Sequence, residues 1–239
     1  MTLKKYLLLF LITSASYASS QELSFDKIKN HYKSSHKGGC IKIYRSEQEE
    51  LQQIILIRHG EPDLKKNGWT NRKGAMRYSQ KYDQVGIKSF EVHPFCEGEL
   101  FGDTVFHSTL ERAKNTADRL FREQVTLVGK DDFIEFERKI FVFPNIPLPL
   151  KFWTSTSRIF WILGFNDRGI ENFKKAKKRA KKNAEFLEEY SRDHGEAILV
   201  AHGLHNKFVL KSLKKKGWKH VRSGGSGYLS IQILAKEPE

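Results

Sequence analysis

Two short apolar runs in this sequence each end in a histidine that is followed by glycine. They are Ile54–Ile57, which leads into Arg58, His59 and Gly60, and Ala197–Ala201, which leads into His202 and Gly203. Short apolar runs of this kind are typical of buried parallel strands, and open α/β sheets bind their ligands at the carboxyl ends of such strands. The glycines let the backbone turn and approach a ligand closely. We therefore expect His59 and His202 to meet at one edge of a sheet.

The residue types at this expected edge suit phosphoryl transfer. A neutral imidazole is a competent nucleophile near neutral pH, and a covalent intermediate divides one difficult displacement into two easier steps. A phosphoryl group in transfer carries charge on its equatorial oxygens, which fixed cations stabilise. Guanidinium groups bind phosphate with two parallel hydrogen bonds. Arg58 directly precedes His59, so the sequence predicts a nucleophile with a phosphate-binding arginine beside it.

Three segments, in order, resemble the motifs of the histidine phosphatase (phosphoglycerate mutase-like) superfamily. They are Leu56-Ile57-Arg58-His59-Gly60-Glu61, then Ser108-Thr109-Leu110-Glu111-Arg112-Ala113 with Thr116-Ala117, and finally Val200-Ala201-His202-Gly203. The resemblance extends from about Ile54 to Leu234. It implies that His59 forms a phosphohistidine that water hydrolyses. It also implies that the phosphate is held by Arg58, Arg112, Gly203 and His202, with His202 protonated beside it.

The leaving alcohol needs a proton, so a carboxylic acid should lie opposite the nucleophile. In the family this acid follows the strand after the second motif, which here is the stretch Phe133–Glu137. We take Glu137 as the proton donor and Glu135 as the alternative. The two residues are two apart on an extended segment, so their side chains point to opposite faces and at most one lines the site.

Several alternatives to a phosphatase are weaker. Family mutases commonly carry Ser or Thr after the Glu of the first motif, whereas Pro62 stands here. A catalytically silent protein that binds an anionic ligand or a lipid headgroup would more readily have lost one of the four motif residues. A zinc site needs three or four ligands at recognisable spacing. His202 and His205 alone do not supply them, and no cofactor is expected.

The elements that must position these residues alternate between strand and helix. Strands are expected over 54–57, 104–106, 133–136, 197–201 and 228–234, and helices over 110–122, 170–192 and 204–215. This alternation predicts an α/β fold with a mostly parallel sheet and helices on both faces. A single domain should span residues 19–239.

An aromatic and proline-rich segment interrupts this pattern at about residues 139–169. Pro144, Pro147 and Pro149 exclude regular structure at its start, and several Phe and Trp follow. We expect a cap insertion that packs on the domain or covers the site. Contact with lipid is the alternative interpretation.

The N-terminus resembles a secretory signal peptide. Lys4 and Lys5 precede the apolar stretch Tyr6–Ile12, and Ser16-Tyr17-Ala18 offers a cleavage site after Ala18. This predicts export of the protein, to the periplasm or out of the cell. Cys40 and Cys96 are the only cysteines, and the sequence leaves open whether they form a disulfide.

The chain is strongly basic, with a formal net charge of +14. Such a surface favours anionic partners. We expect a phosphorylated small molecule or surface glycolipid as substrate and, as a weaker partner, an anionic membrane. Nucleic acid is not expected, because the lysine run Lys174–Lys182 lacks interleaved aromatic residues and is typical of a solvated helix face. The sequence does not indicate an oligomeric state.

Overall fold

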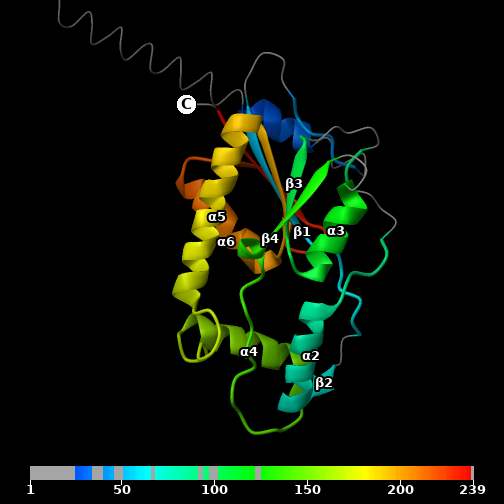
Figure 1. Ribbon diagram of the computed structural model, residues 1–239, viewed down its shortest axis with the longest axis vertical. Helices are drawn as coiled ribbons and strands as arrows, with labels where there is room; N and C mark the ends of the chain where they lie inside the picture. Colours follow the sequence, from blue (N-terminus) through cyan, green and yellow to red (C-terminus); the bar gives the residue numbers. More distant parts are fainter. Residues whose placement is uncertain are drawn as a thin grey trace, which may run out of the picture.

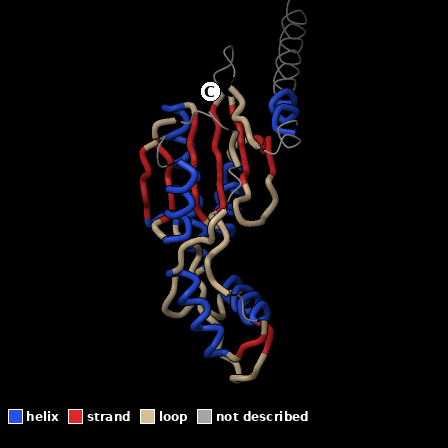
Figure 2. Tube along the Cα trace, turned by 90° about the vertical axis from the view of Figure 1, so that its right-hand side faces the viewer, coloured by secondary structure: helices blue, strands red, loops and turns tan. Residues whose placement is uncertain are grey.

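The computed structural model describes residues 25–33, 40–45, 51–65, 68–90, 94–96, 102–121 and 125–237. Six strands form one sheet in the order β4-β3-β6-β1-β8-β7 (Figures 1 and 2). Their bounds are β1 Gln52–Arg58, β3 Thr104–Ser108, β4 Thr126–Lys130, β6 Glu196–Ala201, β7 Lys219–Ser223 and β8 Ile231–Lys236. Neighbouring strands from β4 to β1 are parallel, and β8 pairs antiparallel with both β1 and β7. The fold is therefore α/β with a mostly parallel sheet, as the sequence predicts.

Both faces of the sheet are buried, because the apolar runs of the central strands have no polar alternation. In β1, Ile55 and Ile57 point into one core, which α3 (Glu111–Phe121) and the helix at residues 25–33 cover. Ile54 and Leu56 point into the other core, under α5 (Phe173–His194) and α6 (Gly203–Lys215). Both histidine motifs therefore start from the rigid centre of the sheet.

A smaller lobe lies beyond the sheet edge at which β1 and β6 end (Figures 1 and 2). It contains β2 (Trp69–Thr70), α2 (Arg72–Gln84), β5 (Leu148–Pro149) and α4 (Leu150–Ile162). We call residues 68–82 and 138–166 the distal lobe. It has its own small core, formed by Ala75, Ile140, Phe141, Leu150 and Trp153. The indole of Trp153 donates a hydrogen bond to the carbonyl of Thr70 over 2.9 Å, which ties α4 to β2.

The aromatic segment expected at about residues 139–169 thus divides into two parts. Residues 139–147 have no regular structure, in agreement with their prolines, whereas Leu150–Ile162 forms the helix α4. Arg158 of α4 donates hydrogen bonds to the carbonyls of Phe136 and Glu137, over 2.8 Å each. These bonds connect the lobe to the loop that leaves the sheet.

Two strand predictions are wrong. Residues 133–136 are not a strand, since a 3₁₀ helix at Asp131–Phe133 leads into a loop. Phe133 and Phe136 both point into the core beneath α5 and α6, a spacing of three that a strand cannot give. The strand that follows α3 is β4 instead. At the C-terminus the last strand starts at Ile231 rather than at 228, because a turn with a left-handed Leu229 (φ 56°) precedes it.

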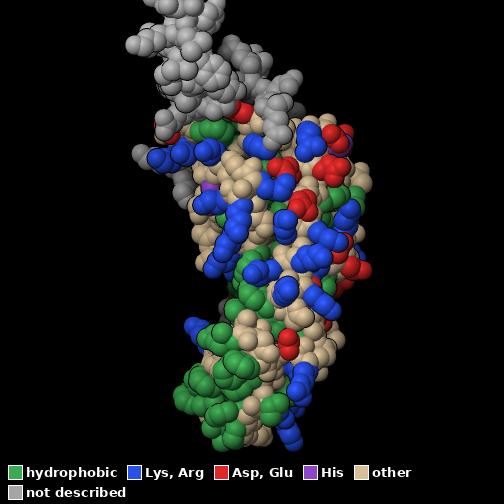
Figure 3. All heavy atoms as spheres, turned by 90° about the vertical axis from the view of Figure 1, so that its left-hand side faces the viewer, with side chains coloured by type: hydrophobic (Ala, Val, Ile, Leu, Met, Phe, Trp, Pro, Cys, Tyr) green, Lys and Arg blue, Asp and Glu red, His purple; other side chains and the backbone are tan. Residues whose placement is uncertain are grey.

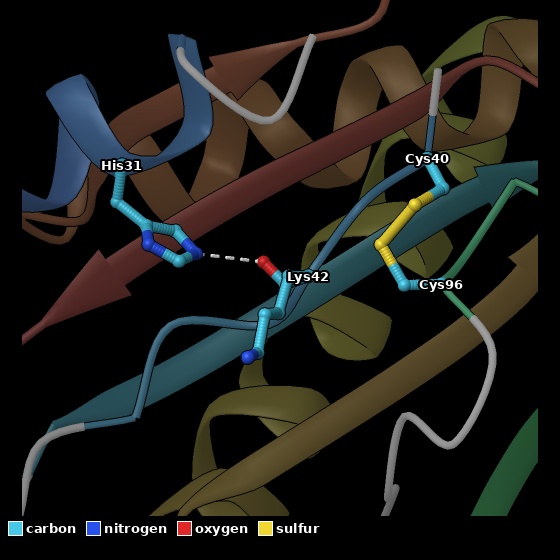
Figure 4. The surroundings of a disulfide bond; sticks show 4 residues. All are labelled: His31, Cys40, Lys42 and Cys96. Carbon is cyan, nitrogen blue, oxygen red and sulfur yellow. Dashed lines mark hydrogen bonds between the residues drawn. A yellow bond between two sulfur atoms is a disulfide. The ribbon is translucent and has the colours of Figure 1, made fainter. Parts of the chain in front are cut away.

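Cys40 and Cys96 form a disulfide, which settles the question that the sequence leaves open (Figure 4). The bond joins two segments that also pair through their backbones. The amide of Ile41 donates to Pro94, and the amide of Cys96 donates to Ile41, over 2.8 and 3.0 Å. Next to this bridge, the ring of His31 is hydrogen-bonded to the carbonyl of Lys42 (Figure 4).

The predicted signal peptide, residues 1–18, lies outside the described residues. Among the described residues, no helix combines the length and the apolar character needed to cross a membrane.

Candidate active site

The carboxyl ends of β1 and β6 bring the two predicted histidines together. The amide of His59 donates to the carbonyl of Ala201 over 3.0 Å, so the two strands stay paired for one residue beyond β1. The ring centroids of His59 and His202 are 5.1 Å apart, and the two side chains are 2% and 0% exposed. Parallel pairing therefore places both imidazoles on one side of the same edge.

Hydrogen bonding fixes which nitrogen of His59 is available for chemistry. Its Nδ1 lies 2.7 Å from the carbonyl oxygen of Gly60, which only accepts, so Nδ1 carries the proton. Nε2 of the neutral ring is then left with its lone pair. Burial, reinforced by the guanidinium groups of Arg112 and Arg58, lowers the pKa of His59 to about 3. The ring is therefore an unprotonated nucleophile at neutral pH.

The second motif positions Arg112 at the start of α3. Its side chain is only 1% exposed, and its Nη1 donates to the carbonyl of Tyr82 over 2.9 Å and lies 3.3 Å from Oδ1 of Asp83. Thr116, from the same motif, accepts a hydrogen bond from the amide of Gly60 over 2.9 Å. The helix thus holds both the arginine and the loop after His59.

Arg58 is held at the opposite side by the C-terminal loop. Its Nη1 donates to the carbonyl of Ser226, and its guanidinium lies 4.5 Å from the ring centroid of Tyr228. A side chain at Gly203 would crowd it, because a Cβ there would lie 3.1 Å from Nε of Arg58. This close approach gives a structural reason for glycine after His202.

His202 is completely buried beside Ser108. Its Nε2 lies 2.7 Å from the Ser108 hydroxyl, which also accepts a bond from the amide of Leu110 over 3.3 Å. The hydroxyl proton is thus free to donate to Nε2, and the proton of the neutral ring then lies on Nδ1. Burial, together with the charge of Arg112, lowers the pKa of His202 well below its usual value. In the protein without ligand this ring is therefore a neutral donor, and its protonation beside a bound phosphate stays a prediction.

Four buried polar atoms at this site have no hydrogen-bond partner within the described part of the chain. They are Nε of Arg58, of Arg112 and of Arg138, and Nδ1 of His202. Leaving a buried donor unpaired is costly, so such atoms usually mark a ligand-binding site. Three of the four belong to positively charged guanidinium groups. The arrangement suits an anion with several acceptor oxygens.

The structure disagrees with the choice of Glu137 as proton donor. Glu137 is exposed, and its carboxylate accepts a hydrogen bond from the backbone amide of Glu171. Glu135, the alternative, lines a cavity of about 720 Å³ together with Arg58 and His59. Its carboxylate accepts from the amides of Leu204 and His205 at the start of α6, over 3.4 and 3.2 Å. The helix terminus therefore turns Glu135 toward the site and leaves Glu137 outside it.

The sequence did not single out Tyr82 and Arg138, which also line this cavity. Tyr82 lies against Arg112, with the guanidinium 4.7 Å from its ring centroid, and Arg138 lines the same cavity. Burial raises the pKa of Tyr82 to about 12, so its hydroxyl remains a donor. Neither residue belongs to a motif. Ser108 does lie in the second motif, and that position was the one available signal for its role. No group of three or more His, Cys, Asp or Glu side chains among the described residues could hold a metal ion.

Residues 54–239 match the sequence model of the histidine phosphatase superfamily (branch 1). The chain belongs to this superfamily. Membership supports a phosphatase or mutase-like function, and thus an enzyme that acts on phosphate esters. No curated protein sequence is a significant match to the chain.

Several solved structures are similar to the chain at low sequence identity. Phosphoglycerate mutase from Bacillus anthracis str. Sterne has a TM-score of 0.51 at 15% identity, covering 81% of this chain and 91% of its own. A mycobacterial glucosyl-3-phosphoglycerate phosphatase, in complex with VO3, has a TM-score of 0.46 at 17% identity, covering 76% and 90%. A putative alpha-ribazole-5'-P phosphatase from Escherichia coli str. K-12 substr. MG1655 has a TM-score of 0.45 at 16% identity, covering 68% and 79%. The mutase supports the fold assignment, and these likenesses carry no information on substrate.

Proposed function

We propose that this protein is an exported, metal-independent phosphatase that hydrolyses phosphate monoesters through a phosphohistidine on His59. Within the superfamily this makes it a phosphoric monoester hydrolase of the histidine acid phosphatase type. One observation carries the proposal. Three buried donors without partners, on Arg58, Arg112 and His202, surround a neutral histidine whose Nε2 is free. This is the charge and geometry that a phosphoryl group in transfer requires.

In the first step, Nε2 of His59 forms a bond to phosphorus while the bond between phosphorus and the ester oxygen breaks. The two arginines and Nδ1 of His202 stabilise the equatorial oxygens. Glu135 is the carboxyl group on this cavity that is placed to give its proton to the leaving alkoxide.

In the second step, water attacks the phosphorus of the phosphohistidine. Glu135, now a carboxylate, accepts a proton from this water. The bond between phosphorus and Nε2 breaks, and phosphate leaves with His59 restored to its neutral form. The same carboxyl group thus acts first as acid and then as base.

The test is hydrolysis of p-nitrophenyl phosphate and of a panel of alkyl phosphates by the wild-type protein and by His59→Ala. We expect loss of turnover in the variant by about 10⁴-fold or more, as for removal of other covalent nucleophiles. Brief exposure of the wild type to labelled substrate should give an acid-labile, base-stable phosphoenzyme at His59. Full turnover by His59→Ala would refute the mechanism.

The same assay distinguishes a phosphatase from a mutase and from a catalytically silent binding protein. A mutase would transfer the phosphoryl group to an added phosphorylated acceptor faster than to water. A catalytically silent binding protein would bind vanadate but turn over no ester. We expect vanadate to inhibit hydrolysis, since it mimics phosphate at the cluster of donors.

A further inference from the structure

All the large apolar side chains that the described residues expose lie in the distal lobe. The most exposed are Phe165 at 81%, Val142 at 80%, Trp69 at 70%, Leu163 at 59% and Ile159 at 54%. Figure 3 shows apolar side chains gathered over the end of the molecule that this lobe forms, whereas many lysines and arginines, with some carboxylates among them, lie on the same face of the sheet domain. Soluble proteins rarely expose such a concentration of apolar surface without a partner for it.

Helix α4 explains much of this surface because it is apolar on two sides. Trp153 and Trp161 are buried at 0% and 1% exposure, whereas Phe152 and Ile159, on the other side, are 42% and 54% exposed. A helix that is apolar all round is normally covered on every side. The lobe core, at Trp153, and the core under α5 and α6, at Trp161, thus cover one side of α4. The other side has no partner among the described residues.

The charge of the lobe indicates what covers this surface. Residues 68–82 and 138–166 contain eight Lys or Arg and no Asp or Glu. Three carboxylates directly flank these ranges, at Asp83, Glu137 and Asp167, so the basic residues still outnumber them. Asp83 lies against Arg112, and Glu137 accepts from a backbone amide. A second copy bound through this face would bring two cationic surfaces together, which repel each other.

We propose that the distal lobe docks on the surface of an anionic lipid bilayer. Its aromatic and aliphatic side chains enter the boundary between headgroups and acyl chains, and its lysines and arginines bind the anionic headgroups. Apolar area and positive charge are the two contributions that make interfacial binding stable, and neither alone suffices. The lobe supplies both on one small tip.

A consequence for the substrate follows, and it rests on the function proposed above. A second cavity of about 400 Å³ lies between the lobe and the site. It is lined by Tyr78, Lys151 and Thr154 of the lobe, by Tyr82, which lines both cavities, and by Tyr228 of the C-terminal loop. A phosphate monoester on a membrane amphiphile could therefore place its phosphate at His59 while its body lies along the lobe. We infer that the preferred substrate is presented from the bilayer.

Binding can be measured with the one exposed tryptophan as reporter. The other three, Trp153, Trp161 and Trp218, are 0–2% exposed, whereas Trp69 is 70% exposed. The full-length protein is mixed with vesicles of phosphatidylcholine alone, or with roughly one-third phosphatidylglycerol as the anionic lipid. Lipids brominated on their acyl chains should quench Trp69 in the anionic vesicles only.

Two double variants test the two contributions. Ile159→Ser/Phe165→Ser removes apolar surface, and Lys73→Glu/Arg77→Glu reverses charge on exposed positions of α2. Each should weaken partition into anionic vesicles by about tenfold or more. The matched control is Lys211→Glu/Lys215→Glu on exposed positions of α6, which changes the net charge equally and should weaken partition less than about twofold.

The proposal is overturned if the wild type does not bind anionic vesicles, or if both lobe variants bind like the control. It is also overturned if sedimentation shows a dimer that Ile159→Ser/Phe165→Ser dissociates, since a second copy would then cover the patch. Hydrolysis separates the remaining claims. The apolar variant should lose activity on phosphatidic acid in vesicles and keep it on p-nitrophenyl phosphate.

Vesicle binding without hydrolysis of either ester would reject the proposed function and leave the docking intact. Unchanged hydrolysis of phosphatidic acid by a variant that no longer binds vesicles would reject the membrane-presented substrate.

Discussion

The carboxyl edge of the sheet and the distal lobe expose opposite kinds of chemistry. At the sheet edge, His59, Arg112 and His202 are almost fully buried. Four buried polar atoms of this site have no hydrogen-bond partner within the described residues. At the lobe, apolar side chains such as Phe165 are exposed instead. Each arrangement has an energetic cost in the protein alone, and a ligand of matching chemistry removes it. An anion is therefore the proposed ligand of the first region, and an anionic lipid bilayer is the proposed partner of the second.

The largest expected effect is a difference in activity between variants of Glu135 and Glu137, which lie near the boundary between the two regions. Glu135→Gln should lower kcat for alkyl phosphates by about 10²–10⁴-fold, the usual contribution of general acid catalysis. The loss should shrink for aryl phosphates, whose phenols leave without a proton. Glu137→Gln, its matched control two residues away, should retain nearly full activity because its carboxylate binds Glu171 instead.

Leaving-group dependence measured in both variants checks this assignment. Glu137→Gln could instead show the leaving-group dependence while Glu135→Gln does not. In that case the loop that holds both residues must rearrange when substrate binds, and the site would include part of the boundary with the distal lobe.

Stability should also separate the two regions. Leu199→Ala, in the centre of β6 and 0% exposed, should lower the free energy of unfolding by about 2–5 kcal/mol, as other buried leucines do. Ile159→Ala, on the exposed side of α4, should change it by less than about 0.5 kcal/mol. Urea denaturation of both variants measures the difference. A large loss from Ile159→Ala would show that this side of α4 is covered in the free protein.

The pH dependence of stability should come from the sheet edge. His59 and His205 have a pKa of about 3 in the folded protein, lowered chiefly by burial, against 6.5 in the unfolded chain. Below pH 6.5 the unfolded chain binds protons that the folded protein does not, so stability is lost as the pH falls toward 3. Each ring contributes a slope of about 1.4 kcal/mol per pH unit in that range and none above it.

His205→Gln should remove one such contribution. Denaturant titrations of this variant and of the wild type at pH 5 and pH 7 give the two slopes. Equal slopes would contradict the neutral, buried state of His205, whose Nε2 lies 2.8 Å from the amide nitrogen of Asn183.

The smallest expected effect is that of metal removal. The proposed chemistry uses only side chains, so extensive chelation should leave kcat and KM for p-nitrophenyl phosphate unchanged within error. Loss of turnover on chelation, with recovery on adding zinc, would mean that His59 and His202 bind a metal rather than a phosphoryl group.

The sequence by itself determined the parts of this protein that depend on local pattern. Two apolar runs that end in His-Gly predict two buried strands, and parallel strands must bring their carboxyl ends to one edge. This geometry is why His59, His202 and Arg58 could be placed together without a structure. Arg112 followed from its motif. The helices α3, α5 and α6 were predicted to within a few residues because their apolar spacing is regular, whereas α2 and α4 were not predicted.

Tertiary structure decided the features that no periodic pattern in the sequence predicts. Whether Glu135 or Glu137 faces the site depends on the start of α6, whose amides bind one carboxylate from some 70 residues away. The pairing of Cys40 with Cys96 depends on two segments that meet only in the folded chain. The aromatic segment predicted a packed cap, but only one side of α4 is buried in the structure. Burial depends on which residues surround a side chain, and those around α4 include α2 and β2, which lie far earlier in the chain.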